Sequence, residues 1–358
     1  MLATGSKIMR RFALSPLGGL YNAVTFFRNK AFDVGLLKTE RVPYPVIAVG
    51  NLTAGGTGKT PLVEYIVAFL LRRGKKVAVL SRGYGRLSRG PVVVSDGRSL
   101  LVDAAEGGDE AVQVARKFPG AVVIVSERRA VGALKAGEFG AEVIVLDDAF
   151  QHRYIHRDCN ILVIDAAKDI RLELPLPAGR RREPLAGIRR ADLIVWAGGG
   201  AGVKLEDLAH LVEPYFSGPM VRALVEVHRL VRAGSGEAEG VNELAAQRVL
   251  AFSGIGNPGR FAETVAGTGA ELAGWVTFQD HHRYTEEDIQ GLLETFRTSR
   301  AEMMVTTEKD AVRMMADREI RENFLARFPV WFLPIQIRLS AGEEVLHRMI
   351  EGVLPART

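Results

Sequence analysis

The segment 46–61 combines residue types that bind phosphate groups. A β-branched run at its start leads into a glycine-rich turn, after which Lys59 and Thr60 begin an apolar stretch. This order predicts a strand, a loop and a helix. Backbone N–H groups of the loop face an anion, Lys59 reaches the outer phosphates, and Thr60 offers a hydroxyl to Mg²⁺. The predicted phosphate-binding residues are Thr53, Ala54, Gly55, Gly56, Thr57, Gly58, Lys59 and Thr60.

This segment departs from the strict phosphate-loop motif at one position. The motif has glycine five residues before Gly58, where this chain has Thr53. An ordinary glycine-rich turn is the alternative interpretation. The apolar strand before the turn and the apolar helix after it favour the phosphate loop.

A pair of acids follows the apolar run 143–146. At a strand end beside a phosphate loop, carboxylates such as Asp147 and Asp148 hold or orient Mg²⁺. Adjacent carboxylates repel each other unless a cation lies near, so the pair itself indicates a metal. Helix capping by one of the two acids is the alternative.

Two further motifs each allow two interpretations. Asp109 and Glu110 follow two glycines at the start of a predicted helix, where acids usually serve as caps. His281, within Asp280-His281-His282, suggests metal ligation or proton transfer. No cysteine or further histidine cluster accompanies it, so zinc is disfavoured.

Polar loops also follow predicted strands. The basic, proline-punctuated loop 174–184 is either solvated or binds an anionic headgroup or substrate phosphate. The segments 254–258 and 306–310 are polar loops at strand ends of a second lobe, where we expect them to face a cleft.

Composition limits the class of protein. The chain has 358 residues, enough for two domains or one large one, and its single cysteine, Cys159, excludes a disulfide framework. The net charge is +5, and no acid precedes Asp33. The rest of the chain is therefore nearly neutral, which argues against nucleic acid as a partner. The basic residues before Asp33 are Lys7, Arg10, Arg11, Arg28 and Lys30.

The basic N-terminus also carries an apolar helical face. Leu17, Leu20, Tyr21, Val24 and Phe27 have helical spacing, and no segment reaches the length of a membrane span. We predict a basic amphipathic helix over residues 1–32 that lies in a membrane interface. The alternative is that this helix only packs on the domain.

The remaining pattern predicts an α/β protein. Strands alternate with helices or loops up to residue 197, which indicates a P-loop NTPase-like, mostly parallel sheet with helices on both faces. A second α/β series begins after residue 240, and the extended segments 221–231 and 330–339 are expected to pair as a two-stranded ribbon. The predicted domains are the helix 1–32, the core 33–218, a smaller α/β domain 219–340 and a returning helix in 341–358.

Several motifs in order resemble one known family, the tetraacyldisaccharide 4′-kinases that phosphorylate the lipid A precursor. The resemblance runs from the N-terminal helix to about Leu339. The motifs are Gly50–Pro61, Ser81–Arg86, Gly108-Asp109-Glu110, Asp147–His152, Leu176–Gly179 with Arg182-Glu183-Pro184, Gly254–Pro258, Asp280-His281-His282 and Thr306–Asp310.

The resemblance implies an activity and partners. It implies ATP-dependent phosphorylation of the 4′-hydroxyl of an acylated disaccharide 1-phosphate lipid at the cytoplasmic face of the inner membrane. ATP and Mg²⁺ are the implied cofactors, and we expect no obligate protein partner. A membrane-recruited partitioning ATPase is the alternative, but those proteins have a second lysine where this chain has Ala54. A soluble small-molecule kinase or ligase leaves the N-terminal helix unexplained.

The resemblance also implies residue roles. Asp109 acts as the base, coupled to His281, and Lys59 completes the catalytic set. Thr60, Glu110, Asp147 and Asp148 serve Mg²⁺ or its waters. Ala149 stands where the family usually has glycine, and the chain is longer than many members around 198–202 and 233–240. The resemblance assigns substrate-binding or accessory roles to Arg82, Arg128, Gln151 and Glu183.

Overall fold

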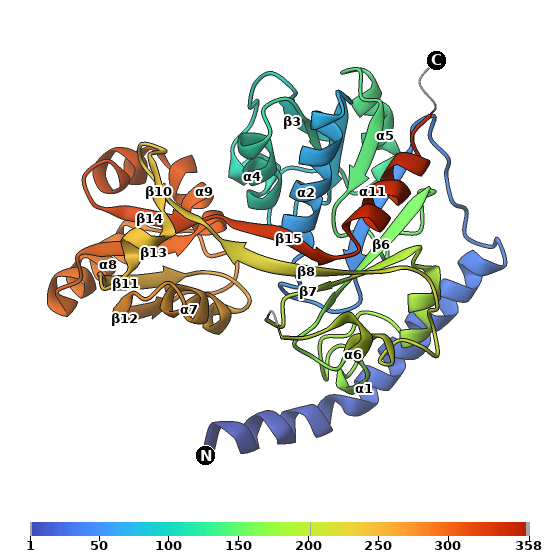
Figure 1. The fold of residues 1–358 in the computed structure, drawn as a ribbon, viewed down its shortest axis with the longest axis horizontal. Coiled ribbons are helices and arrows are strands. Elements are labelled where there is room, and N and C mark those ends of the chain that lie inside the picture. The colour runs from blue at the N-terminus through green and yellow to red at the C-terminus, as the bar shows by residue number, and fades with distance from the viewer. Residues whose placement is uncertain (1, 201, 356–358) are drawn as a thin grey trace. The chain divides into compact units, whose positions relative to one another are not determined.

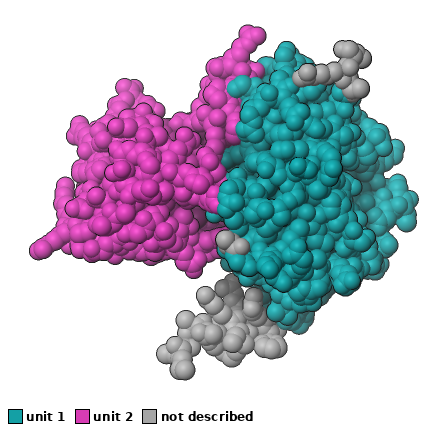
Figure 2. Space-filling model, in the orientation of Figure 1, with its two compact units in different colours: residues 1–82, 120–225, 337–358 teal, residues 83–119, 226–336 magenta. Residues whose placement is uncertain are grey.

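A computed structural model describes residues 2–200 and 202–355. The ends of the first and last predicted domains, and one residue of the glycine-rich segment 198–202, lie outside the described residues. Two compact units make up the chain, coloured separately in Figure 2. Unit 1 contains Met1–Arg82, Gly120–Val225 and Ile337–Thr358, and unit 2 contains Gly83–Pro119 and Glu226–Gln336. The segment Gly83–Pro119, which our predicted division placed in the core domain, thus belongs with unit 2.

Unit 1 is built on a mostly parallel sheet, and the predicted α/β class is confirmed (Figure 1). Within unit 1 the strand order is β15-β8-β7-β6-β1-β5-β2-β4. The elements are α1 (Leu2–Asp33), β1 (Val46–Asn51), α2 (Lys59–Arg72), β2 (Val77–Ser81), β4 (Val122–Val125), α5 (Arg129–Gly137), β5 (Val143–Leu146), β6 (Cys159–Asp165), β7 (Leu193–Ala197), α6 (Leu205–Ala209), β8 (Met220–Val227), β15 (Ile335–Ala341) and α11 (Glu343–Gly352).

The register of β1 determines which loops meet. Strand β1 is buried along its whole length and pairs in parallel with β5, with Ala48 opposite Leu146, and with β6, with Asn51 opposite Val163. Parallel strands end at the same edge of the sheet, so the loops after β1, β5 and β6 emerge together. These loops include the predicted phosphate loop and the Asp147-Asp148 pair.

The N-terminal helix α1 continues through Pro16 to Asp33. Its later turns bind loops of unit 1, since the Tyr21 hydroxyl donates to the Arg182 carbonyl and Arg28 donates to the Gln151 carbonyl. Leu20 and Phe27 nevertheless remain 63% and 69% exposed. The side chains of Lys7, Arg10 and Arg11 lie outside the described residues. Among the described helices, none combines the length and hydropathy of a membrane span.

Unit 2 contains a smaller sheet with the order β10-β9-β14-β13-β11-β12. Its strands β11 to β14 pair in parallel, and β9 runs antiparallel to β14. The elements are β3 (Val92–Asp96), α3 (Ala104–Gly107), α4 (Asp109–Lys117), β9 (Arg229–Arg232), β10 (Ala238–Gly240), β11 (Arg248–Ser253), α7 (Pro258–Ala266), β12 (Glu271–Thr277), α8 (Glu286–Ser299), β13 (Met303–Thr307), α9 (Glu308–Ala316), α10 (Arg318–Ile320) and β14 (Val330–Leu333).

The two extended segments pair as expected, β8 beside β15 and β9 beside β14, but they and one predicted loop differ from the structure in detail. Each predicted extended segment is broken, at His228 between β8 and β9 and at Pro334 between β14 and β15. Proline supplies no N–H to a strand ladder, which accounts for the second break. The predicted polar loop 306–310 is instead the end of β13 and the first turn of α9. The Thr307 side chain accepts a hydrogen bond from the Asp310 N–H as the cap of that helix.

Candidate active site

The loop between β1 and α2, predicted to bind phosphate, has glycine where its backbone turns sharply. Gly55 and Gly58 have φ values of 105° and 88°, which L-residues with a side chain rarely adopt. The Asn51 side chain donates to the Thr57 hydroxyl at 2.8 Å, and the Ala54 N–H donates to the Arg180 carbonyl at 2.7 Å. The loop is therefore held both from its own strand and from the basic loop 174–184.

Lys59 and Asp148 meet at the start of α2. The Lys59 Nζ lies 3.6 Å from Asp148 Oδ1, and Arg182 Nη1 donates to both oxygens of Asp148 at 2.7 and 2.9 Å. Burial raises the pKa of Asp148, but Lys59 and Arg182 outweigh it and hold that pKa below its ordinary value. Asp148 is therefore an anion fixed between two cations.

The other residues predicted to bind Mg²⁺ in unit 1 lie at the same sheet edge. Asp147 is buried at the end of β5, and Thr60 is the second residue of α2. Asp148 adopts a left-handed backbone with φ of 49°. Hydroxyl and carboxylate oxygens are the donors that Mg²⁺ prefers, so this set fits the ion. The described residues contain no group of three or more His, Cys, Asp or Glu side chains arranged to hold a metal.

Two of the predicted accessory residues connect α1 to the phosphate loop. Gln151 donates to the Asn51 carbonyl at 2.7 Å and to Glu183 at 2.8 Å. Glu183 is buried, and it accepts from Arg190 at 2.7 Å and from Asn29 of α1 at 2.8 Å. The structure thus brings Gln151 and Glu183 together in one network that includes the end of β1.

The other two accessory residues lie apart from that network. Arg82 is exposed just after β2. Arg128 caps the start of α5 through its backbone, and its exposed guanidinium lies 3.3 Å from Glu40.

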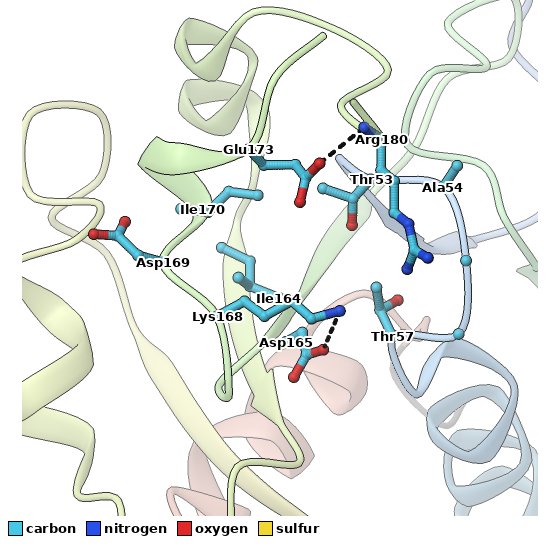
Figure 3. Close-up of a pocket in the computed structure, with 12 residues that line it drawn as sticks. Thr53, Ala54, Thr57, Ile164, Asp165, Lys168, Asp169, Ile170, Glu173 and Arg180 are labelled. Carbon is cyan, nitrogen blue, oxygen red and sulfur yellow. Dashed lines mark hydrogen bonds and ion pairs between the residues drawn. The ribbon is translucent and has the colours of Figure 1, made fainter. Parts of the chain in front are cut away.

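A pocket adjoins the phosphate loop in unit 1 (Figure 3). Its empty volume is about 400 Å³, open solvent included, and its wall is formed by the loop 53–57 and by the segment after β6. Lys168 pairs with Asp165 at 3.6 Å, and the Arg180 N–H donates to Glu173 at 2.9 Å. No recognisable sequence motif marks this polar wall, because Asp165 at the end of β6 and the Lys168 and Asp169 that follow it have no characteristic spacing.

The predicted base and its histidine are in contact within unit 2. Asp109 is the first residue of α4 and its side chain is 5% exposed, and its Oδ2 lies 3.0 Å from Nδ1 of His281. His281 follows β12 with a left-handed φ of 58°, a costly conformation for a residue other than glycine. The Tyr84 ring lies 4.9 Å from the His281 ring.

Charge fixes the ionisation of this pair. Burial raises the pKa of Asp109, but the His281 hydrogen bond and the charges of Arg313 and Lys309 outweigh it and lower that pKa well below its usual range. The hydrogen bond with Asp109 raises the pKa of His281 against the effect of burial. Asp109 is therefore a carboxylate at neutral pH.

Glu110, predicted to serve Mg²⁺, forms an ion pair with Lys309 of α9. Arg313, one turn further along α9, contacts Asp109. No motif in the sequence singles out Arg313, and Lys309 was expected only as part of a polar loop. The Thr-x-x-Asp pattern of Thr307 and Asp310 was the available signal for a helix there.

Comparisons with known proteins match this chain over nearly its whole length to one family. Residues 10–354 match the family model described as tetraacyldisaccharide-1-P 4'-kinase. A tetraacyldisaccharide 4'-kinase of Chlorobium phaeovibrioides is 37% identical, with 95% of this chain and 97% of that protein covered. The protein of the same name from Chlorobaculum parvum is 39% identical, with 97% and 96% covered. The crystal structure of LpxK from Aquifex aeolicus in complex with ATP aligns with a TM-score of 0.77 and 35% identity, covering 96% of this chain and 99% of that one.

Proposed function

The chain belongs to the tetraacyldisaccharide-1-P 4'-kinase family, and on that premise we propose that it transfers the terminal phosphoryl group of ATP to the 4′-hydroxyl of an acylated disaccharide 1-phosphate. The observation that carries this proposal is the contact between Asp109 and His281. A phosphate loop is common to many ATPases, whereas a buried carboxylate held by a histidine suits acceptance of a proton from an alcohol.

The phosphates of ATP bind the loop 53–60 in this proposal. Lys59 and the backbone N–H groups at the start of α2 complement the phosphate charge. Thr60, Asp147 and Asp148 would hold Mg²⁺, which neutralises charge on the β- and γ-phosphates when bound. Lys59 is already oriented by Asp148, so its ammonium is positioned before ATP arrives.

Asp109 receives the proton of the acceptor hydroxyl. The sugar O–H bond breaks and its proton passes to the Asp109 carboxylate. The sugar oxygen bonds to the γ-phosphorus, and the bond from that phosphorus to the β-phosphate oxygen breaks to release ADP. The low pKa of Asp109 is compatible with this role, because phosphoryl transfer through a loose transition state depends mainly on positioning and charge. His281 orients the carboxylate.

The N-terminal helix brings the enzyme to its lipid substrate, at the cytoplasmic face of the inner membrane. Leu17, Leu20, Val24 and Phe27 are all more than half exposed on α1. Tyr21 and Arg28 bind loops of unit 1, so one helix carries both an unburied apolar face and anchoring contacts. An apolar helical face flanked by basic residues favours an anionic interface.

The partitioning-ATPase alternative is not favoured. Position 54, where those proteins have a second lysine, is alanine. Such an ATPase also has no use for a sugar-directed carboxylate such as Asp109.

The test is to incubate the purified protein with γ-labelled ATP, Mg²⁺ and the disaccharide 1-phosphate lipid in mixed micelles. We expect one labelled phosphate on the lipid, located at the 4′ position by phosphorus NMR. Label released only as inorganic phosphate, or found at another hydroxyl, would contradict the proposal.

A further inference from the structure

One face of helix α9 is directed at the first turn of α4, and the two helices pack together within unit 2. Lys309 and Arg313 are four residues apart, so they lie on the same face of α9. Lys309 pairs with Glu110, while Arg313 donates from Nε and Nη2 to Asp109 Oδ2 at 2.8 and 2.6 Å. Helix α9 thus contacts both acids at the start of α4.

The guanidinium of Arg313 is itself fixed in place. Its Nη1 donates to the Gly254 carbonyl and to Asp310 Oδ1, both at 2.8 Å, and its side chain is 8% exposed. Asp310 is fully buried and also accepts from the Tyr284 hydroxyl at 2.9 Å and the Gly254 N–H at 3.1 Å. A planar donor anchored by these two partners has little freedom to change the direction in which it meets Asp109.

The two oxygens of Asp109 therefore differ. Oδ2 faces three nitrogen atoms, two from Arg313 and Nδ1 of His281. Oδ1 accepts one hydrogen bond among those of the described residues, from the Glu110 N–H at 2.9 Å. A carboxylate oxygen accepts about two hydrogen bonds, so Oδ1 retains capacity for a further donor.

We propose that Arg313 is a positioning residue that, together with His281, engages Oδ2 of Asp109 and so presents Oδ1 to the acceptor hydroxyl. This inference rests on the proposed role of Asp109 as the base. Arg313 acts through Asp109 and touches neither ATP nor the sugar.

If Arg313 had a purely structural role, it would act like the neighbouring contacts that only join α4 to α9. Gln113 and Lys117 of α4 both contact Glu308 of α9, at 3.2 and 3.7 Å, and join the helices without touching Asp109. Loss of a joining contact lowers the melting temperature. Loss of a positioning contact lowers kcat, leaves KM for ATP unchanged and has no effect once Asp109 is disabled.

The experiment compares Arg313→Gln, Arg313→Lys, Asp109→Asn and the double variant Asp109→Asn/Arg313→Gln in the lipid phosphorylation assay. Arg318→Gln is the matched control, because Arg318 is exposed and pairs only with Glu322 among the contacts of the described residues. We expect Arg313→Gln to lose about 10²-fold in kcat, the effect of a misplacement of roughly 1 Å, with KM for ATP unchanged. Arg313→Lys should retain part of the kcat that Arg313→Gln loses, since the lysine ammonium can still donate to Oδ2 of Asp109, although with fewer donors than a guanidinium. The double variant should match Asp109→Asn.

Each outcome decides the inference. A wild-type kcat for Arg313→Gln beside an impaired Asp109→Asn would overturn the role of Arg313 and leave that of Asp109 intact. Losses that multiply in the double variant would also overturn it. Normal turnover by Asp109→Asn would instead remove the base assignment, and this inference with it. If Arg313→Gln does not fold, Arg313→Lys decides alone: reduced kcat with unchanged KM for ATP supports the role, and wild-type kcat overturns it.

Discussion

Asp109 and His281 are 172 positions apart in the sequence, yet Oδ2 of the first lies 3.0 Å from Nδ1 of the second. Both belong to unit 2, because the segment Gly83–Pro119 joins residues 226–336 in that unit. The insertion between β2 and β4 therefore places the start of α4 beside the loop after β12. A carboxylate that looks like a helix cap in the sequence becomes a buried, histidine-bound anion in the fold.

Lys59→Ala should lower kcat by at least about 10²-fold, because a fixed positive charge at the developing phosphate charge is lost. Asp148 would keep its contact with Arg182, so the fold should survive. Steady-state kinetics of lipid phosphorylation check this, with Lys135→Ala on α5 as a surface control. A kcat within a factor of two of wild type would show that the loop 53–60 does not hold the transferred phosphate.

Replacing Leu20, Val24 and Phe27 of α1 by glutamine should weaken sedimentation with anionic vesicles by at least about a hundredfold in partition coefficient. These side chains are exposed, so the contacts of Tyr21 and Arg28 with unit 1 remain. The matched control replaces Leu134 and Leu272, exposed leucines elsewhere, by glutamine. Equal sedimentation of the two variants would show that the apolar face of α1 does not bind the membrane.

Gly50→Ala should destabilise unit 1 by about 3 kcal/mol or more, because the added Cβ would collide with the backbone nitrogen of Phe150. At this close approach the Ala149 N–H donates to the Val49 carbonyl at 3.0 Å, which holds β1 against the loop that carries Asp147 and Asp148. Thermal or chemical denaturation measures the loss. Gly19→Ala, at an exposed position of α1 with open space around it, should stabilise by up to about 1 kcal/mol through helix propensity. Equal stability of both variants would disprove the close approach.

His152 should make stability fall as the pH drops. Burial and the nearby Arg129 and Arg157 lower the pKa of His152 to about 4. Between that pH and about 6.5, its ordinary value, the unfolded chain binds a proton that the folded protein does not, so stability rises with pH there. His152→Gln should reduce the slope of the unfolding free energy against pH in this range by up to about 1.4 kcal/mol per pH unit. The free energy of unfolding is measured by urea denaturation at several pH values. If it depends on pH identically in wild type and variant, His152 does not contribute to that dependence.

Local patterns predicted much of the fold. The helix predicted to start at Asp109 and Glu110 is α4, and the glycine-rich loop follows β1 as expected. These elements depend on apolar periodicity and on glycine, which act over a few residues. The Thr285 cap of α8 and Pro258 at the start of α7 follow the same local rules.

Contacts between distant elements were not predictable in the same way. Arg313 reaches Asp109 across 204 positions, and nothing in its local sequence distinguishes it from other arginines on a helix. The bridge between Thr53 and Arg181, which joins the phosphate loop to the basic loop, is likewise long-range. The helix α9 was missed because its first turn is polar and was interpreted as a loop.

The most direct test of the account measures single-turnover phosphorylation of the disaccharide lipid by Asp109→Asn, together with its affinity for ATP. We predict a loss of about 10²- to 10⁴-fold in the rate of transfer, with ATP affinity unchanged, because only the proton acceptor is removed. Transfer at the wild-type rate would contradict the central claim that Asp109, held by His281, accepts the proton of the sugar hydroxyl.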